Sequence, residues 1–405
     1  MMKIDKVLKG VLEKIKLDEK ELGKMNSGIK EFVSELEKKI RKNRIKADVF
    51  VGGSSGKGTV VRRKTQDIDV FVRFKNEKEI SKLEKIIPGK KKKIHGSRDY
   101  FKSSYKKLNF EVVPVLKIKK PQEARNVTDL SYFHVSYINK KMKKRDLRDD
   151  VRLAKNFCYS SGCYGAESYI FGFSGYALEL LIIYYKGFLN FIRIISKVKK
   201  QIIIDSEKYY KNKQDILTNL NEAKLSSPIV FIDPTFKERN ILSSLSYETF
   251  LKFQEACKKF LKNPNEKFFF KQEINKKRFN LILKAKTNKQ EGDIAGSKLW
   301  KFFSFLAREL EKYFLIATKE FEYDIGKSAL LYFKIKKKKR IIREGPLIND
   351  FKNVVRFKKK NKNVFVKNNR VYAKEKIPKI KEFLNSFKNK NKIVMKDMGI
   401  SGLEF

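Results

Sequence analysis

Apolar side chains recur at helical spacing through the first 42 residues, which predicts two helices separated by a break at Ser27-Gly28. The pattern then changes to short apolar runs bounded by glycine-rich or polar sequence. These runs predict three strands, at 47–51, 68–74 and 109–118. Helices beside a short sheet predict a small α/β or α+β domain that ends near residue 135.

Helical spacing returns in the middle of the chain. The clearest helices are predicted at 148–159 and 173–196, whereas 197–226 is polar and basic with a weaker pattern. The segment 245–261 places several aromatic residues along one helical face. Asn263-Pro264-Asn265 then punctuates the chain, and we interpret it as a domain edge.

The sequence after residue 265 mixes strand and helix patterns. A helix is predicted at 302–315, and the apolar runs on either side of Lys367-Asn368-Asn369 predict a hairpin. Short lysine-rich runs recur at 336–340, 358–360 and 388–392. Basic runs are usually solvated loops, but beside strands and aromatic residues they also suit a surface that binds the RNA backbone.

Charge is the unusual feature of the composition. The chain has 95 Lys and Arg against 46 Asp and Glu, a formal net charge of +49, while its 41% apolar content is that of a folded protein. Such an excess opposes compaction unless a polyanion is nearby, and nucleic acid is the natural partner because each neutralised phosphate releases a counterion. A lysine-biased proteome would produce a similar excess, and this alternative stays open.

The cysteines, the histidines and the hydropathy of the chain bear on its cellular compartment and on the kinds of metal site it could hold. The three cysteines, Cys158, Cys163 and Cys257, fit no zinc spacing and predict a reducing cytoplasm. The presence of only two histidines argues against a histidine-rich metal site. The most apolar stretch, 177–195, contains three charged residues and reads as a buried helix. With no apolar signal segment at the N-terminus, we expect a soluble cytoplasmic protein with no membrane partner.

A glycine-rich loop, Gly53-Ser54-Ser55-Gly56-Lys57-Gly58-Thr59, follows the first predicted strand. Glycine lets the backbone approach a ligand closely, and free N–H groups at a helix start, joined by the Ser54 hydroxyl, favour phosphate. Lys57 would place a cation near the same phosphates. The spacing is not that of a P-loop, and such a loop alone is also compatible with a plain turn.

The strand after the loop carries two carboxylates. Because side chains alternate along a strand, Asp67 and Asp69 share one face while the apolar residues between them pack on the other. Two carboxylates on one face repel each other unless a cation lies between them. Mg²⁺ fits this position, since it is a hard ion that seeks oxygen ligands and is often shared with substrate phosphates.

The third predicted strand adds Glu111 among apolar neighbours. An acid in such a place is costly unless it is paired or bound to a metal. Pro114 limits this strand to an edge or a strand end, near a sheet opening where a site can form. Each acidic feature alone could be a salt-bridged surface group, but the loop and the carboxylates in this order favour a catalytic site.

A Gly-Ser loop, an Asp-x-Asp strand and a lone acidic strand residue together resemble the polymerase-beta-type nucleotidyltransferase superfamily. Further segments resemble the archaeal, class I CCA-adding enzymes, which are tRNA nucleotidyltransferases, and they occur in order across nearly the whole chain. They are Arg152-Leu153-Ala154-Lys155, Gly162-Cys163-Tyr164-Gly165-Ala166-Glu167, the stretch 172–181 that begins Gly172-Phe173-Ser174-Gly175-Tyr176, Asp233-Pro234, Lys237-Glu238-Arg239-Asn240 and Arg343-Glu344-Gly345-Pro346.

The resemblance implies an α+β multidomain fold with a small mixed-sheet catalytic head, a helical neck, and a mixed α/β body and tail. With the chain's own punctuation, we expect the nucleotidyltransferase head at 1–135 and the neck with its nucleotide pocket at 136–262. The RNA-binding body and tail are expected at 263–405. The resemblance implies CTP and ATP as substrates, Mg²⁺ as cofactor and tRNA as partner, through its acceptor arm and 3′ end. A homodimer stays open.

Residue roles are also implied by the resemblance. Asp67, Asp69 and Glu111 match the catalytic metal-binding triad. Gly53, Ser54 and Lys57 match the loop that faces the triphosphate. The remaining nucleotide-pocket positions are His134, Lys155, Tyr164 and Arg239, of which Arg239 matches an arginine that helps the family read the incoming base. Without the resemblance, Tyr164 would be taken as core, Lys155 as a solvated helix residue, and His134 as a packed, hydrogen-bonded histidine.

The chain departs from the family pattern in two places. Glu111 stands where the family usually has Asp, and its extra methylene would shift the metal geometry or the rate. The stretch between Lys57 and Asp67 is one residue longer than usual, so the alignment of 62–66 is open.

The implied reaction is in-line attack of the tRNA 3′ hydroxyl on the α-phosphate of CTP and then ATP, with release of pyrophosphate. A poly(A) polymerase or another terminal nucleotidyltransferase shares the catalytic head and is the first alternative. A catalytically silent RNA-binding protein is the second, although the presence of all three acids argues against it. A protein that only binds nucleic acid by charge would leave the acidic strands unexplained.

Overall fold

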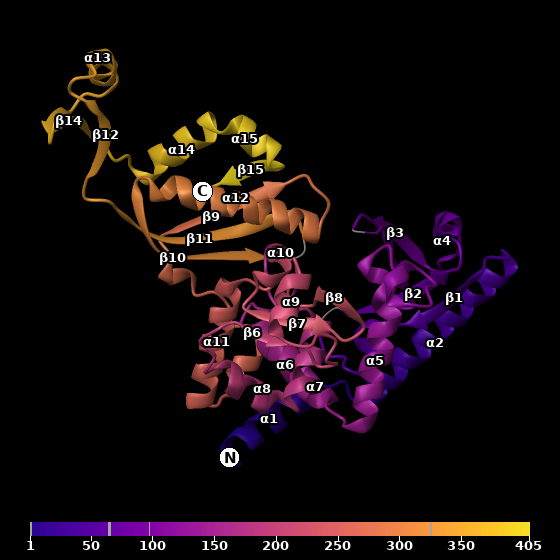
Figure 1. The fold of residues 1–405 in the computed structure, drawn as a ribbon. Coiled ribbons are helices and arrows are strands. Elements are labelled where there is room, and N and C mark those ends of the chain that lie inside the picture. The colour runs from indigo at the N-terminus through magenta and orange to yellow at the C-terminus, as the bar shows by residue number, and fades with distance from the viewer. Residues whose placement is uncertain (1, 64–65, 97, 325) are drawn as a thin grey trace. The chain divides into compact units, whose positions relative to one another are not determined.

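The computed structural model describes residues 2–63, 66–96, 98–324 and 326–405. The chain forms two compact units, coloured along the sequence in Figure 1. Unit 1 comprises Met1–Ala166 and Ile170–Gln272, and unit 2 comprises Glu167–Tyr169 and Glu273–Phe405. Unit 1 thus contains both regions that we separated at residue 135, and that division stays a prediction. Among the described residues, no helix has the length and apolar character needed to span a membrane.

The first sheet of unit 1 has the strand order β1-β2-β5-β4-β3. β2 and β5 run parallel, and the other neighbours run antiparallel. The bounds are β1 Ala47–Val51, β2 Asp67–Phe74, β3 Lys90–Ile94, β4 Tyr100–Tyr105 and β5 Leu108–Leu116. All three predicted strands are therefore present. β5 is not an edge strand, since it lies between β2 and β4. Its pairing with β4 stops at Val112, however, so Pro114 lies beyond the last residue that pairs with β4.

Two long helices, α1 (Met2–Ile15) and α2 (Glu19–Lys42), precede this sheet. The predicted break at Ser27-Gly28 is wrong, because α2 continues through both residues. The real break comes earlier, where Asp18 and Glu21 form a capping box at the start of α2. Gly28 is retained inside the helix because any larger side chain would collide with Leu108 of the sheet. α2 lies along the sheet (Figure 1), and its residues Phe32, Leu36 and Ile40 enter the core of the sheet.

The rest of unit 1 is mainly helical. Its helices are α3 Gly53–Lys57, α4 Leu83–Ile86, α5 Ser131–Lys144, α6 Arg148–Ser160, α7 Gly175–Tyr185, α8 Phe188–Ile195, α9 Lys213–Asn219, α10 Glu222–Leu225 and α11 Tyr247–Lys262. The predicted helix at 173–196 is split into α7 and α8. Lys186 and Gly187 both have positive φ, 60° and 132°, which ends one helix before the next begins. Apolar residues on both sides of the turn hid this break from the sequence pattern.

A small sheet within this helical region was not predicted. Its order is β6-β7-β8, with bounds Ile202–Ile204, Ile229–Asp233 and Phe236–Asn240. The strands are only 3 to 5 residues long, too short for a clear period of two. β7 is wholly buried. The sheet matters for the site because Asp233 ends β7 and Arg239 lies in β8.

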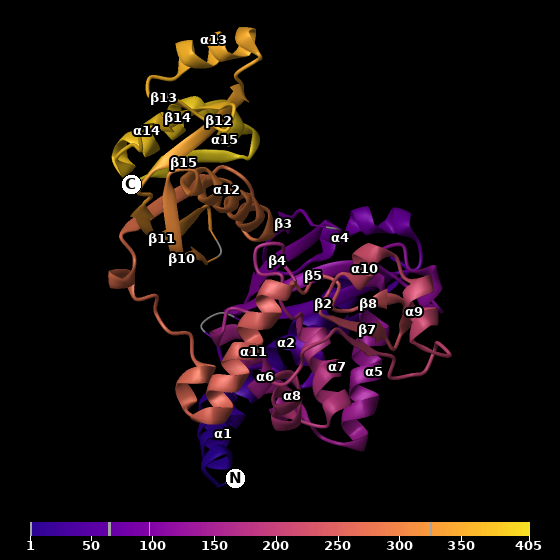
Figure 2. The same cartoon turned by 60° about the vertical axis from the view of Figure 1, so that its left-hand side comes forward.

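Unit 2 contains a four-stranded sheet, β10-β11-β9-β15, covered by α12, which lies against β10 and β11 in Figure 2. The bounds are β9 Leu281–Thr287, α12 Asp293–Glu311, β10 Phe314–Tyr323, β11 Ser328–Lys337, α14 Ile380–Lys390, α15 Lys392–Asp397 and β15 Ile400–Glu404. The helix predicted at 302–315 is therefore longer at its start, and its last two residues belong to β10.

The predicted hairpin is present in a second, three-stranded sheet of unit 2 with the order β12-β14-β13. The bounds are β12 Ile341–Leu347, α13 Phe351–Lys360, β13 Val364–Lys367 and β14 Arg370–Glu375. Asn368 and Asn369 both have positive φ, which asparagine tolerates and which a tight two-residue hairpin turn requires. Together the two units have the mixed α+β architecture that was predicted.

Candidate active site

Charged side chains form a row across neighbouring strands of the first sheet. The pairing of β2 with β5 places Asp69 opposite Glu111, and the pairing of β4 with β5 places Lys102 opposite Glu111. Asp67 lies two residues before Asp69 and so shares its face. The apolar residues of β2 are buried on the other face, as expected: Ile68, Val70 and Val72. Strand register alone thus brings the three predicted acids together.

The surroundings of Asp69 oppose its ionisation. Burial, reinforced by the negative charges of Glu111 and Asp67, raises the pKa of Asp69 to about 7. The ammonium groups of Lys57 and Lys155 act in the opposite direction and lower this pKa. The carboxylate face therefore has an excess of negative charge, and the positive charges of both lysines act on it.

Lys102 is the cation that this face already has. Its Nζ lies 2.9 Å from Glu111 Oε1 and 3.4 Å from Asp67 Oδ2. Partial burial would lower the pKa of Lys102, but the charges of Glu111 and Asp67 raise it above its usual range. The sequence analysis did not identify Lys102, because only the sheet register shows that β4 lies beside β5.

The donor chemistry of this face fits a divalent cation. Its carboxylate oxygens are hard ligands of the kind that Mg²⁺ prefers, and the ammonium of Lys102 stands between two of them as a cation would. Among the residues that the structure describes, no group of three or more His, Cys, Asp or Glu is already arranged to hold a metal ion. The predicted triad thus shares a face, and the Lys102 ammonium lies against two of its acids.

The Gly-Ser segment forms the short helix α3 directly against Asp69. Gly53 has φ of +53°, and a Cβ there would collide with the Asp69 carboxylate. Glycine is therefore required both by the backbone conformation and by the close approach. The backbone N–H of Gly52 donates to the carbonyl of Asp69 at 2.9 Å, which fixes the loop to β2. Ser54 is the second residue of α3 and so lies in the same segment.

Lys57 and Lys155 lie together in a buried group. Lys57 Nζ donates to Glu179 Oε2 at 2.5 Å, and Lys155 Nζ donates to Glu179 Oε1 at 2.9 Å. Lys155 also donates to Thr59 Oγ1 at 2.8 Å. The side chain of Lys155 is only 5% exposed, so it is not a solvated helix residue. Sequence analysis assigned both lysines to nucleotide binding but gave no role to Glu179, although this acid lies in the 172–181 stretch and is a lone acid within an apolar helix.

His134 and Arg239 meet at a second buried acid, Asp233. His134 Nε2 lies 3.2 Å from Asp233 Oδ2, and Arg239 Nη1 donates to the same oxygen at 2.9 Å. Tyr176 donates to Oδ1 at 3.1 Å and stacks on the His134 ring at 4.0 Å. Burial would raise the pKa of Asp233, but His134 and Arg239 lower it to about 2. Asp233 thus holds the arginine and the histidine in fixed positions.

Tyr164 lies beside the lysine group. A Cβ at Gly175 would lie 3.1 Å from the Tyr164 hydroxyl and 3.8 Å from Lys155 Cε, so all three residues meet in one place. The guanidinium of Arg63 lies over the Tyr164 ring at 5.2 Å. Burial raises the pKa of Tyr164 to about 12, so the hydroxyl stays a donor. The family alignment of 62–66 was left open above, and residues 64–65 of this segment lie outside the described residues.

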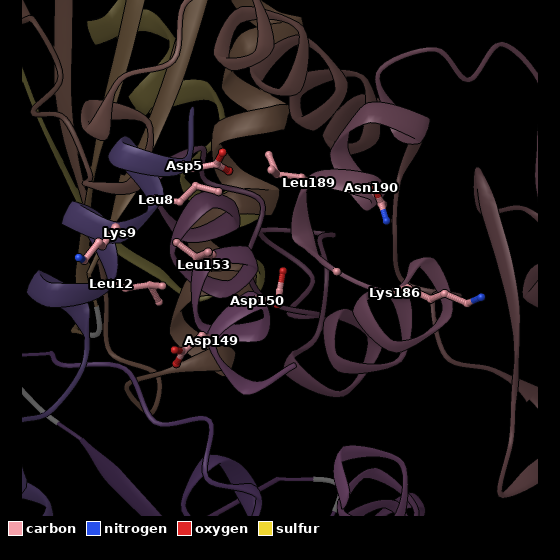
Figure 3. Close-up of a pocket in the computed structure, with 11 residues that line it drawn as sticks. Asp5, Leu8, Lys9, Leu12, Asp149, Asp150, Leu153, Lys186, Leu189 and Asn190 are labelled. Carbon is pink, nitrogen blue, oxygen red and sulfur yellow. The ribbon is translucent and has the colours of Figure 1, made fainter. Parts of the chain in front are cut away.

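A cavity of about 390 Å³ lies elsewhere in unit 1, between α1, α6 and the turn before α8 (Figure 3). It is lined by the apolar side chains of Leu8, Leu12 and Leu153 and by the acids Asp5 and Asp149. None of the predicted site residues lines it. The site of interest is therefore the carboxylate face with its two neighbouring groups, not this cavity.

Two family models match the chain. The model for the second domain of tRNA nucleotidyltransferases matches residues 149–270. The model for the Second Messenger Oligonucleotide or Dinucleotide Synthetase domain matches residues 2–176. The first match covers α6, Glu179 and Arg239, and the second covers the Gly-Ser helix and the three acids.

Similar solved structures include a cytoplasmic RNA terminal U-transferase. It is 15% identical with a TM-score of 0.53, and the match covers 68% of this chain and 100% of that one. The Cid1 RNA terminal uridylyl transferase gives the same TM-score at 13% identity, with 68% and 99% covered. At this identity the likeness shows the fold alone, which is that of a nucleotidyltransferase.

Curated relatives are more similar in sequence. A CCA-adding enzyme of Nanoarchaeum equitans is 39% identical over 274 residues, or 65% of this chain and 67% of that enzyme. The CCA-adding enzyme of Methanocaldococcus jannaschii is 29% identical over 92% of this chain and 88% of its own length. The match with the Thermoplasma volcanium enzyme, at 33% identity, spans only 57% of that relative. The resemblance found in the motifs is thereby confirmed, and the chain belongs to the family of archaeal CCA-adding enzymes.

Proposed function

We propose that this protein adds C, C and A to the 3′ end of tRNA from CTP and ATP, without a nucleic-acid template and with release of pyrophosphate. The observation that carries the proposal is the row formed by Asp67, Asp69 and Glu111, which lies against the Gly-Ser helix. The charges of two buried lysines lower the pKa of Asp69 in this row. An acidic face for a divalent cation beside a basic group for phosphates is the arrangement that nucleotidyl transfer needs.

The carboxylate face is proposed to bind the reacting atoms. Two Mg²⁺ ions, when bound there, supply Lewis-acid activation of the tRNA 3′ hydroxyl and neutralise the leaving pyrophosphate. Asp67, Asp69 and Glu111 would hold these ions, and Glu111 is also proposed to accept the proton of the hydroxyl. Because Asp69 is raised to a pKa of about 7, its ionised form is favoured only when a cation is present or the pH is high.

The other two groups are proposed to bind the nucleotide. Lys57 and Lys155 supply positive charge for the triphosphate, with Ser54 as a hydroxyl donor. Tyr164, which lies beside Lys155, is proposed to pack on the nucleotide. His134 and Arg239 are proposed to contact the base, and Arg239 is held for that role by Asp233.

Unit 2 is proposed to bind the acceptor arm of the tRNA. Helix α13 ends in Lys358, Lys359 and Lys360, and its Phe351 and Val355 side chains are 75% and 53% exposed. Cationic side chains bind phosphates, and exposed apolar side chains can pack on bases. A tRNA substrate also fits a cytoplasmic location.

The test is incubation of a tRNA lacking its 3′ CCA with Mg²⁺ and labelled CTP and ATP. We expect three added nucleotides that end in A, resolved on a sequencing gel. No incorporation of either nucleotide would refute the proposal. A long homopolymer would instead favour the terminal nucleotidyltransferases, whose fold the chain shares.

A further inference from the structure

A single carboxylate joins the two lysines assigned to the triphosphate. Glu179 belongs to α7, Lys57 ends the Gly-Ser helix α3, and Lys155 belongs to α6. The Glu179 side chain has 0% exposure and accepts from both ammonium groups and from Thr59 Oγ1, at 2.5, 2.9 and 3.2 Å. One acid in α7 thus connects the neighbouring helix α6 to α3, which lies far away in the sequence.

The charges in this group do not cancel. Two ammonium groups and one carboxylate leave one surplus positive charge in a buried place. Burial would raise the pKa of Glu179, but Lys155 and Lys57 lower it, so the acid stays ionised. The charges of both lysines also lower the pKa of Asp69, so the surplus positive charge acts on the carboxylate face.

We propose that Glu179 is a positioning residue for nucleotide binding, which holds the ammonium groups of Lys57 and Lys155 in place to receive the triphosphate of CTP or ATP. The inference rests on the proposed function and assigns a role to an acid that touches no substrate itself. A buried lysine that loses its counter-charge is free to move towards solvent. The hydrogen bonds to Glu179 hold both ammonium groups against such movement.

Removal of the Glu179 charge has two effects of opposite sign. An anion near the triphosphate repels it, so by its field alone the loss of Glu179 would tighten nucleotide binding. The same loss frees both ammonium groups from the acid that fixes their positions, which weakens binding. The second effect should dominate, because Glu179 contacts both ammonium groups directly. The sign of the change therefore decides the proposal.

The experiment compares Glu179→Gln with the wild type. We expect the KM for CTP and for ATP to rise about tenfold, with kcat changed by less than about threefold. The Kd for CTP, measured by calorimetry without tRNA, should rise in parallel. Glu207→Gln is the matched control, since Glu207 also accepts from a lysine, Lys141, but at the protein surface, and its KM should not change. An unchanged or lower KM in Glu179→Gln would overturn the inference.

Thr59→Val is a second variant that leaves every charge in place. It removes the hydroxyl that Lys155 contacts at 2.8 Å, so we expect the KM to rise about threefold. This variant decides the matter if Glu179→Gln does not fold; an unchanged KM would then refute the positioning role. A wild type that incorporates no nucleotide would instead refute the proposed function, so the two failures are distinguishable.

Discussion

The carboxylate face of β2 and β5 and the lysine group around Glu179 carry opposite charge in opposite settings. On the sheet, the side chains of Asp67 and Glu111 are 41% and 22% exposed, and the Lys102 that they share is 40% exposed. In the lysine group, Lys57 is 8% exposed and Glu179 is wholly buried. The first set of charges is negative and reaches solvent at Asp67, Glu111 and Lys102, although Asp69 itself is largely buried, whereas the second set is positive and buried throughout.

This difference separates charges that can change partners from charges that cannot. Exposed pairs are screened and contribute little, so a cation from solution can replace Lys102 at small cost. Removal of one partner from a buried pair costs far more stability, because the remaining charge is not solvated by water. The open face therefore suits an ion that comes and goes with each reaction, and the closed group suits a fixed phosphate-binding site.

Loss of a carboxylate from the open face should have the largest effect. We expect Asp69→Asn to lower kcat for CTP incorporation about 10³-fold or more, since several kcal/mol of charge stabilisation by the metal are lost. Gel-shift measurements should show that tRNA binding persists. Full activity in this variant would exclude Asp69 from the metal site.

Loss of the acid from the closed group should mainly reduce stability. Glu179→Ala should lower the free energy of unfolding by about 3 kcal/mol or more in urea titrations, because two buried ammonium groups lose their partner. Adding Lys155→Met to this variant should recover part of the loss, since one fewer charge is then unpaired. If the double variant is no more stable than the single one, buried charge is not the cause.

The pH dependence should reveal Asp69. An acid whose folded pKa is raised from 3.8 to about 7 favours the protonated folded state, so its contribution to stability falls as the pH rises from about 4 to 7. In metal-free buffer, the wild type should lose up to about 1.4 kcal/mol per pH unit in this window relative to Asp69→Asn. Urea midpoints at a series of pH values measure this loss. Parallel curves for the two proteins would contradict it.

Removal of Lys102 should have the smallest effect, and it should be a gain. Calorimetry should show that Lys102→Met binds Mg²⁺ about fivefold more tightly, since an exposed charge pair contributes about 1 kcal/mol. Lys39→Met is a matched control, because Lys39 pairs with Glu35 on the surface of α2 at 3.0 Å. Equal Mg²⁺ affinity in wild type and Lys102→Met would show that Lys102 does not compete with the metal.

Local patterns predicted the parts of the molecule that local physics controls. Alternation along β2 placed Asp67 and Asp69 on one face, and the paired apolar runs around Asn368-Asn369 predicted the β13–β14 hairpin. They failed where distant contacts decide. Gly28 was read as a break, although a contact with Leu108 explains why glycine is retained inside α2. The turn at Lys186 between two apolar helices left no signal in the period.

The sequence by itself determined the chemistry of the site: the three carboxylates, the Gly-Ser segment, and a resemblance strong enough to indicate the family. Only the tertiary structure decided which charges meet. Lys102 joins the carboxylates through strand register, and Glu179 joins Lys155 to Lys57, which lies 122 residues before Glu179 in the chain. The physical reason is that a charge is costly to bury alone, so its partner must come from whatever element packs beside it, and the sequence does not record that neighbour.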